Sequence, residues 1–157
     1  VLDSSLMGDD VPYILAPPER DLAELPVSWA TDDWPPYVHS IDLDYMFQIM
    51  APDRAMEIFM AEFNAMRTAG GGLWIGVWHP FVSGRLSRWQ RIEQMIEEMV
   101  DTGDAWFAPL EEIAAHCLKM QVEGQVTLRR EALPLYGGTS PLPDPLPSTM
   151  PGAKPRA

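Results

Sequence analysis

Two short segments of the sequence carry acid, histidine and indole side chains that are suited to catalysis. The segment Thr31–Trp34 (TDDW) follows one apolar run, and His79 follows another. A histidine can transfer a proton near neutral pH, and a carboxylate can orient its ring. A purely structural interpretation is also open, in which His79 does no more than cap the end of a strand. Asp32 and Asp33 taken alone are more typical of a solvated acidic turn.

The stretch Gly70–Arg85 (GGGLWIGVWHPFVSGR) is predicted to place His79 at the end of a strand. Leu73–Trp78 is apolar at successive positions, which is typical of a strand buried on both faces in a parallel sheet. Pro80 ends the strand and keeps His79 extended. Catalytic groups of α/β folds gather at this carboxyl edge. A helix opened by a capping box at Ser87–Gln90 is expected to follow.

Periodicity and the positions of proline and glycine predict the remaining elements. Apolar stripes at spacings of three and four residues indicate helices at 52–69, 87–101 and 109–122. Short strands are predicted at 13–15, 22–29, 105–107 and 125–130, and residues 31–36 are expected to be an irregular loop. This alternation predicts a parallel α/β fold with too few strands for a closed barrel.

Composition restricts the classes of partner. The formal net charge of -12 argues against nucleic acid and anionic membranes as partners. No apolar run is long enough to span a bilayer, and the single cysteine, Cys117, excludes an internal disulfide. A cytoplasmic location is therefore expected. Two parts are predicted, a domain at 1–133 and a proline-rich extended tail at 134–157.

Four segments together resemble a known superfamily. They are DSSLMGDDVPY at 3–13, LAELPVSWATDDWPPY at 22–37, WHPFVSGRLSRWQRIEQMIEEM at 78–99 and AWFAPLEEIAAH at 105–116. In this order and spacing they resemble the C-terminal half of the polysaccharide deacetylase (NodB-homology) superfamily. The similarity is greatest to its branch of allantoinase-like enzymes, cyclic imide hydrolases and peptidoglycan deacetylase homologues. Leu86 stands where that family has proline.

The resemblance implies a deformed (β/α) barrel and metal-dependent hydrolysis of a C–N amide bond. In that family an Asp-His-His set holds a divalent metal, commonly zinc, and a late histidine protonates the leaving nitrogen. His79 matches the late histidine, and Asp33 and Trp34 match the motif whose acid tunes that histidine and whose indole walls the pocket. Asp32 is the alternative if the register shifts by one residue, and Arg85 is expected to help position either the loop or an acid supplied from elsewhere.

The metal-binding half of the family pattern is missing from this sequence. No His-x-x-x-His pair occurs among His39, His79 and His116, and the family's metal ligands lie upstream of Val1. We therefore expect half of a barrel, completed by a missing N-terminal segment or by a second polypeptide in a hetero- or homo-oligomer. Zinc would then be held outside this chain, and the substrate would be a small amide or an N-acetylated compound. The alternative is a non-catalytic structural or regulatory subunit derived from the same fold.

Overall fold

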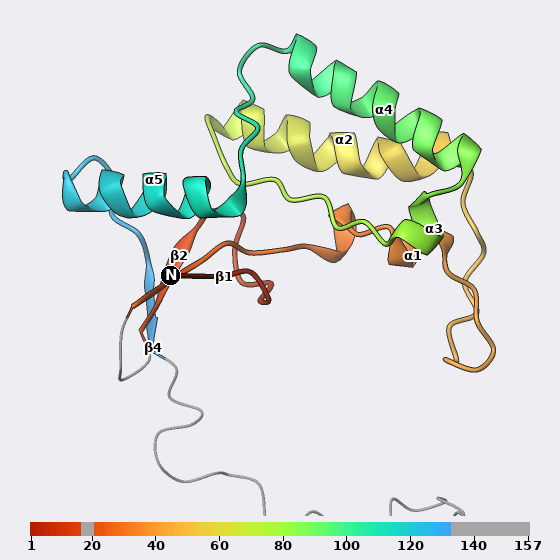
Figure 1. Cartoon of the computed structure of the whole chain (residues 1–157), viewed down its shortest axis with the longest axis horizontal. Coiled ribbons are helices and arrows are strands. Elements are labelled where there is room, and N and C mark those ends of the chain that lie inside the picture. The colour runs from red at the N-terminus through yellow and green to blue at the C-terminus, as the bar shows by residue number, and fades with distance from the viewer. Residues whose placement is uncertain (17–20, 133–157) are drawn as a thin grey trace, which may run out of the picture.

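The segment that carries His79 runs beneath two long helices, α2 (Pro52–Ala69) and α4 (Leu86–Asp101), which pack against each other (Figure 1). The structure is a computed structural model that describes residues 1–16 and 21–132. The predicted tail at 134–157 lies outside the described residues. None of the helices in the described ranges has the length and apolar character needed to cross a membrane.

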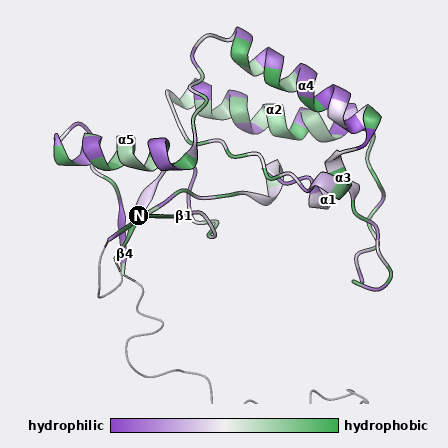
Figure 2. Cartoon of the chain, viewed as in Figure 1, coloured by the Kyte–Doolittle hydropathy of each residue, from purple (hydrophilic) through white to green (hydrophobic). Residues whose placement is uncertain are grey.

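The predicted apolar stripes of α2 and α4 form the main core. The amphipathic pattern of both helices is visible in Figure 2. Phe59 of α2 stacks on Trp78 with ring centroids 4.9 Å apart, which ties the helix to the segment below it. The residues buried in this core are Tyr37, Ala55, Met56, Phe59, Phe63, Val82, Ile92, Met95 and Met99. Burial of these side chains stabilises the layer that holds the His79 segment in place.

The ends of these helices confirm one sequence prediction and contradict another. Pro52 occupies the first turn of α2, and Gly70 ends that helix in the left-handed conformation at φ 91°. The predicted capping box at Ser87–Gln90 is wrong, because α4 begins one residue earlier, at Leu86. Arg85 is its N-cap residue and makes no side-chain capping bond, so Ser87 lies inside the first turn.

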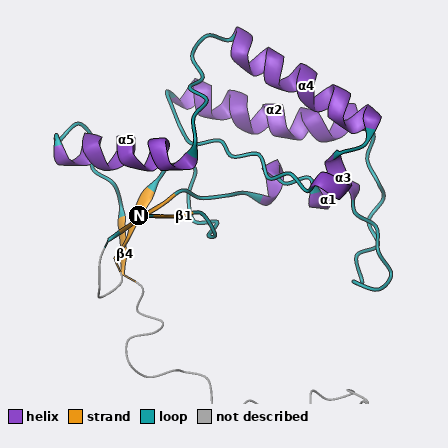
Figure 3. Cartoon of the chain, in the orientation of Figure 1, coloured by secondary structure: helices purple, strands orange, loops and turns teal. Residues whose placement is uncertain are grey.

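A small mixed sheet combines strands from both ends of the described part of the chain and lies apart from α2 and α4 (Figure 3). Its strand order is β1–β3–β2–β4. Its strands are β1 (Leu2–Asp3), β2 (Tyr13–Ala16), β3 (Leu22–Glu24) and β4 (Arg130–Ala132). The expectation of a parallel sheet is met only in part, because β1 with β3 and β2 with β4 pair parallel, whereas β2 and β3 pair antiparallel. Only a few residues connect β2 to β3, and a parallel pair needs a connection of about a dozen residues or more.

Helix α5 (Leu110–Val122) contacts β1 and β3, and its Ala114 packs with Ala23, Leu25 and Leu73 in a second core. Its predicted range is confirmed to within one residue. Strand β1 was not predicted. The edge strand predicted at 125–130 begins only at Arg130.

The predicted strand at Leu73–Trp78 does not form, which is the main correction to the expected fold. The segment makes a single parallel bridge, between Val77 and Asp32. A strand needs continued backbone pairing. Within the described ranges the segment pairs with Thr31–Asp33, and apart from that the Leu73 N–H donates to the Asp10 carbonyl at 3.0 Å. The short strand predicted at 105–107 is also absent from the described structure. A half barrel is therefore not confirmed by the described strands.

Candidate active site

The single bridge between the two chemistry-bearing segments brings their ends together. The Val77 N–H donates to the Thr31 carbonyl at 2.9 Å, and the Asp33 N–H donates to the Val77 carbonyl at 3.1 Å. The Thr31 hydroxyl adds a bond to the Ile75 carbonyl at 2.6 Å. Asp33 and His79 therefore leave the paired region at the same end, as expected for the carboxyl ends of neighbouring parallel strands.

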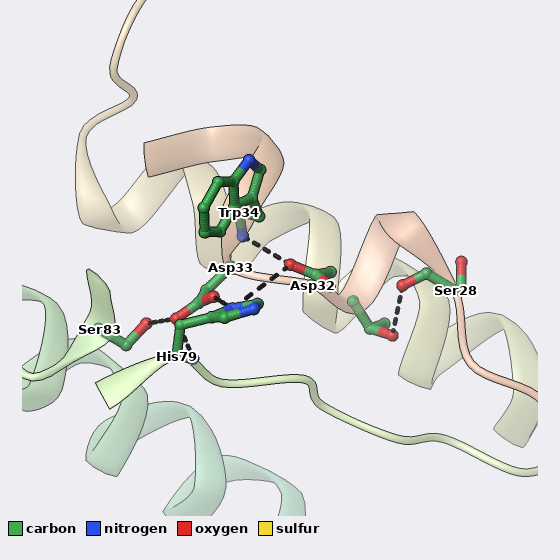
Figure 4. A network of polar contacts seen from close by, with 7 residues as sticks. Ser28, Asp32, Asp33, Trp34, His79 and Ser83 are labelled. Carbon is green, nitrogen blue, oxygen red and sulfur yellow. Dashed lines mark hydrogen bonds and ion pairs between the residues drawn. The ribbon is translucent and has the colours of Figure 1, made fainter. Parts of the chain in front are cut away.

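Asp33 is completely buried and accepts three hydrogen bonds. Its Oδ1 accepts from Nδ1 of His79 at 2.6 Å, and its Oδ2 accepts from the His79 backbone N–H at 2.9 Å. The third donor is the hydroxyl of Ser83, which also binds Oδ2 (Figure 4). Because a carboxylate only accepts, Nδ1 of His79 carries the proton. The Nε2 atom is then the ring position left for substrate.

The two aspartates have different partners, which decides the register that the sequence left open. Asp32 Oδ1 accepts the Trp34 backbone N–H at 2.6 Å, and it lies 3.9 Å from His79 Nδ1. Adjacent residues of an extended chain point to opposite sides, so only one of the two can face the histidine ring closely. That residue is Asp33, while Asp32 fixes the turn into α1 (Trp34–Tyr37). The expectation of an irregular loop at 31–36 is thus wrong, because η1 (Trp29–Thr31) and α1 form there.

Two aromatic rings stand edge-on to His79. The Trp34 ring centroid lies 5.2 Å from that of His79, and the Phe81 centroid lies 5.9 Å from it. Trp34 and Phe81 also meet each other at 6.0 Å. Trp34 thus lies beside His79, and Phe81, which is 68% exposed, lies beside both of them. Edge-on aromatic pairs are favourable, so the three rings support one another's orientation.

Tyr37 is a buried residue close to Asp33. Burial is the main cause that raises the pKa of the Tyr37 hydroxyl, and the nearby Asp33 carboxylate adds to it. The Arg88 guanidinium lies 4.2 Å from the Tyr37 ring centroid and opposes this rise. Arg88 also donates to the Val82 carbonyl at 2.6 Å. A cation thus links α1 and α3 (Pro80–Ser83).

Arg85 is placed apart from the other predicted residues. It is exposed at the start of α4. Within the described part of the chain, no hydrogen bond or ion pair of its side chain joins it to Asp32, Asp33 or His79. The structure therefore brings together four of the five predicted site residues, namely Asp32, Asp33, Trp34 and His79. Their catalytic roles remain predictions.

The ligand atoms of Asp32, Asp33 and His79 lie within 4.8 Å of one another, a spacing that suits a metal ion. Their hydrogen bonds do not suit one. Both oxygens of Asp33 are already occupied by donors, and Nδ1 of His79 carries the proton that it shares with Asp33. A metal at this position would displace these bonds, and metal-bound imidazole nitrogens are unprotonated. The trio fits an oriented acid better than it fits a metal site.

Sequence reasoning missed Ser83 and Phe81. Both belong to α3, a single turn that begins after His79, and neither residue type signals a site by itself. The available signal was Pro80, because proline in the first helical turn predicts a helix there. In such a helix Ser83 lies one turn beyond His79, which places its hydroxyl beside the histidine's partner.

Comparison with solved structures shows what this chain is similar to. A crystal structure described as a putative polysaccharide deacetylase from Mycobacterium smegmatis matches with 41% identity and a TM-score of 0.71. The match covers 82% of this chain and 43% of that protein, so this chain spans less than half of its relative's length. No family model matches the chain. No curated protein matches it either.

Proposed function

With the resemblance to the polysaccharide deacetylase superfamily confirmed by that structural relative, we propose that this chain supplies the acid-bearing part of a deacetylase-like hydrolase. The reaction class is cleavage of a C–N amide bond other than a peptide bond. One observation carries the proposal: buried Asp33 holds His79 by two hydrogen bonds, one of them to Nδ1 at 2.6 Å. This is the pair that the resemblance assigns to the late catalytic step.

The chemistry of His79 follows from its free ring edge. Amide hydrolysis must expel an amine, and an amine leaves only after its nitrogen gains a proton. Protonated Nε2 of His79 would give that proton to the leaving nitrogen as the C–N bond breaks. Asp33 would keep the ring fixed through Nδ1, and Trp34 would form one wall for the acyl or ring portion of the substrate.

The rest of the machinery is assigned to another polypeptide or segment. The Asp32–Asp33–His79 trio does not fit a metal, so the divalent metal implied by the resemblance, zinc, would be held by residues outside this chain. The relative is more than twice as long as the matched region, which supports a completing partner. A partner chain would make the active form a hetero- or homo-oligomer.

An open apolar groove offers that partner a surface. It has a volume of about 640 Å³ and lies between the ends of α2 and α4 and the start of α5. Trp106 and Phe107 line it and are each more than half exposed. Large exposed apolar patches are unusual on a monomer. We assign the groove to the completing polypeptide, because it lies at the end of the 73–78 segment opposite His79.

The substrate is proposed to be a small cyclic amide or imide, or an N-acetylated compound. The formal net charge of -12 disfavours a polyanionic substrate, which the surface would repel. Two aromatic rings beside His79 favour a substrate with an apolar or planar face.

Substitution of the acid tests the function. In the complete, natively purified protein, His79→Ala is expected to lower amide hydrolysis by about 100-fold while assembly is retained. His39→Ala is the matched control, because His39 is an exposed histidine outside both the site and the apolar groove, and its Nδ1 bonds to the Phe47 carbonyl. Unchanged turnover in His79→Ala would remove His79 from the mechanism and favour the non-catalytic subunit.

Denaturing mass spectrometry with metal analysis tests the assembly. A second polypeptide carrying an Asp-His-His set, with about one divalent metal per pair, is the expected result. A single polypeptide without metal in active material would contradict the proposed division of labour.

A further inference from the structure

The helical turn α3 binds Asp33 at both of its ends. At its start, His79 donates to Asp33 through the backbone N–H and through Nδ1. At its end, Ser83 donates through its hydroxyl and closes the turn with its own N–H on the His79 carbonyl at 2.9 Å. Asp33 therefore binds both the residue that precedes this turn, His79, and the last residue of the turn, Ser83, through one carboxylate.

Ser83 is a buried residue that contacts Asp33. Its exposure is 3%, and its hydroxyl must donate to Asp33, because an ionised carboxylate only accepts. Oδ2 already accepts the His79 N–H, so Ser83 is a second donor on the same oxygen. Two donors on Oδ2 fix the rotation of the carboxylate, and this rotation aims Oδ1 at the histidine ring.

The rotation of the Asp33 carboxylate is important because Asp32 is a second possible acceptor for the Nδ1 proton of His79. Asp32 Oδ1 lies 3.9 Å from His79 Nδ1, and the Asp32 side chain is more exposed than that of Asp33. If the Asp33 carboxylate turns away, the Nδ1 proton has a second acceptor within a small movement of the ring. Such a movement would also turn Nε2, the atom proposed to reach the substrate.

We propose that Ser83 is a positioning residue. Its hydroxyl locks the Asp33 carboxylate, so that His79 bonds to Asp33 and not to Asp32 and its Nε2 stays aimed at the substrate. This inference rests on the proposed function for its effect on turnover, and it does not depend on that function for its effect on the histidine ring.

The kinetic test compares two substitutions in the complete protein. Ser83→Ala removes the hydroxyl and is expected to lower kcat about tenfold with KM unchanged, because the proton is transferred only in the transition state. Ser83→Thr keeps a hydroxyl and should retain kcat to within about twofold. An unchanged kcat in Ser83→Ala overturns the proposal. So does a loss that Ser83→Thr fails to restore when both variants unfold at the wild-type denaturant concentration.

A spectroscopic test does not require activity. In the full chain labelled with ¹⁵N-histidine, the Nδ1 proton of His79 should be observed and should exchange slowly with solvent. In Ser83→Ala this exchange should accelerate about tenfold, with His116 as the internal control. Equal exchange in wild type and variant overturns the proposal. If the complete protein hydrolyses no amide but the exchange accelerates, the proposed function fails and the positioning role stands.

Discussion

Two carboxylates of this chain, Asp33 and Glu24, are completely buried, and their surroundings are opposite. Asp33 accepts three hydrogen bonds, and one of its partners is a titratable ring. Glu24 lies in β3, where Oε1 accepts the Leu6 N–H at 3.0 Å and Oε2 has no partner among the described residues. Burial chiefly raises the pKa of Glu24, and Asp3 on the paired strand raises it further.

The contrast shows that burial by itself does not identify a functional acid. A buried charge is tolerated when donors satisfy it and is costly when they do not. The Asp33 environment is built to hold an ionised carboxylate and to orient a histidine through it. The Glu24 environment favours the neutral acid, and it orients no ring. The predictions below use substitutions that should separate the two sites.

Asp33→Asn should cause the largest change in stability. The substitution replaces one acceptor oxygen by an amide group that cannot accept, so at least one buried donor of His79 or Ser83 loses its partner. We expect the free energy of unfolding to fall by about 3 kcal/mol, since a hydrogen bond to a charged group is worth more than a neutral one. Urea denaturation measures this change, and a loss below about 1 kcal/mol would contradict the role assigned to the three donors.

Glu24→Gln should have a smaller effect of opposite sign. The amide removes a buried charge of which one oxygen, Oε2, has no donor among the described residues, and its NH₂ group can donate toward Asp3. The free energy of unfolding at pH 7 is expected to rise by about 1 kcal/mol in the same urea experiment. A fall in the free energy of unfolding like that of Asp33→Asn would contradict the conclusion that the two buried acids have opposite surroundings.

The gain from Glu24→Gln should depend on pH. The pKa of Glu24 is raised in the folded chain from its ordinary value of 4.5, so the folded state binds more protons just above that value. The stability contributed by protonated Glu24 is therefore complete below pH 4.5 and is lost as pH rises through the raised pKa. The advantage of the variant should shrink steadily as the pH of the urea experiment is lowered toward that value.

Asp32→Ala should have the smallest effect. It removes one hydrogen bond to the Trp34 N–H in a partly exposed position and leaves the Asp33–His79 pair in place. We expect a loss of about 0.5 kcal/mol in the free energy of unfolding. A loss as large as that of Asp33→Asn would show that Asp32 stabilises the fold as much as Asp33 does. The assignment of Asp33 as the partner of His79 would then be wrong.

Much of this arrangement could be predicted where local chemistry decides the structure. Helices α2 and α5 follow from proline at their starts, glycine after their ends and an apolar stripe between. The pairing of Asp33 with His79 was implied by the family resemblance, and it agrees with the prediction that both segments end at the carboxyl edge of a sheet. That logic held although the segment before His79 forms a single bridge and no strand.

What sequence reasoning could not decide depends on long-range pairing. Whether Asp32 or Asp33 faces His79 is set by a one-residue register, which the bridge to Val77 fixes. Residues 73–78 are apolar enough for a buried strand. A strand also needs a neighbouring strand to pair with, and the composition of the segment does not show whether one is present. The burial of Glu24 was not predicted, because a single acid within a short apolar run gives no sign in the sequence that its side chain is buried.

The distance along the chain between Asp33 and His79 has a consequence for how the protein folds. Their hydrogen bonds join residues 46 positions apart, with all of α2 in between. Closing so long a loop has an entropic cost, and contacts of large sequence separation slow folding. The hydrogen bonds that orient His79 therefore form only once the loop that contains α2 has closed. A nascent or partly folded chain has no oriented histidine, which ties any proton transfer by this site to completion of the fold.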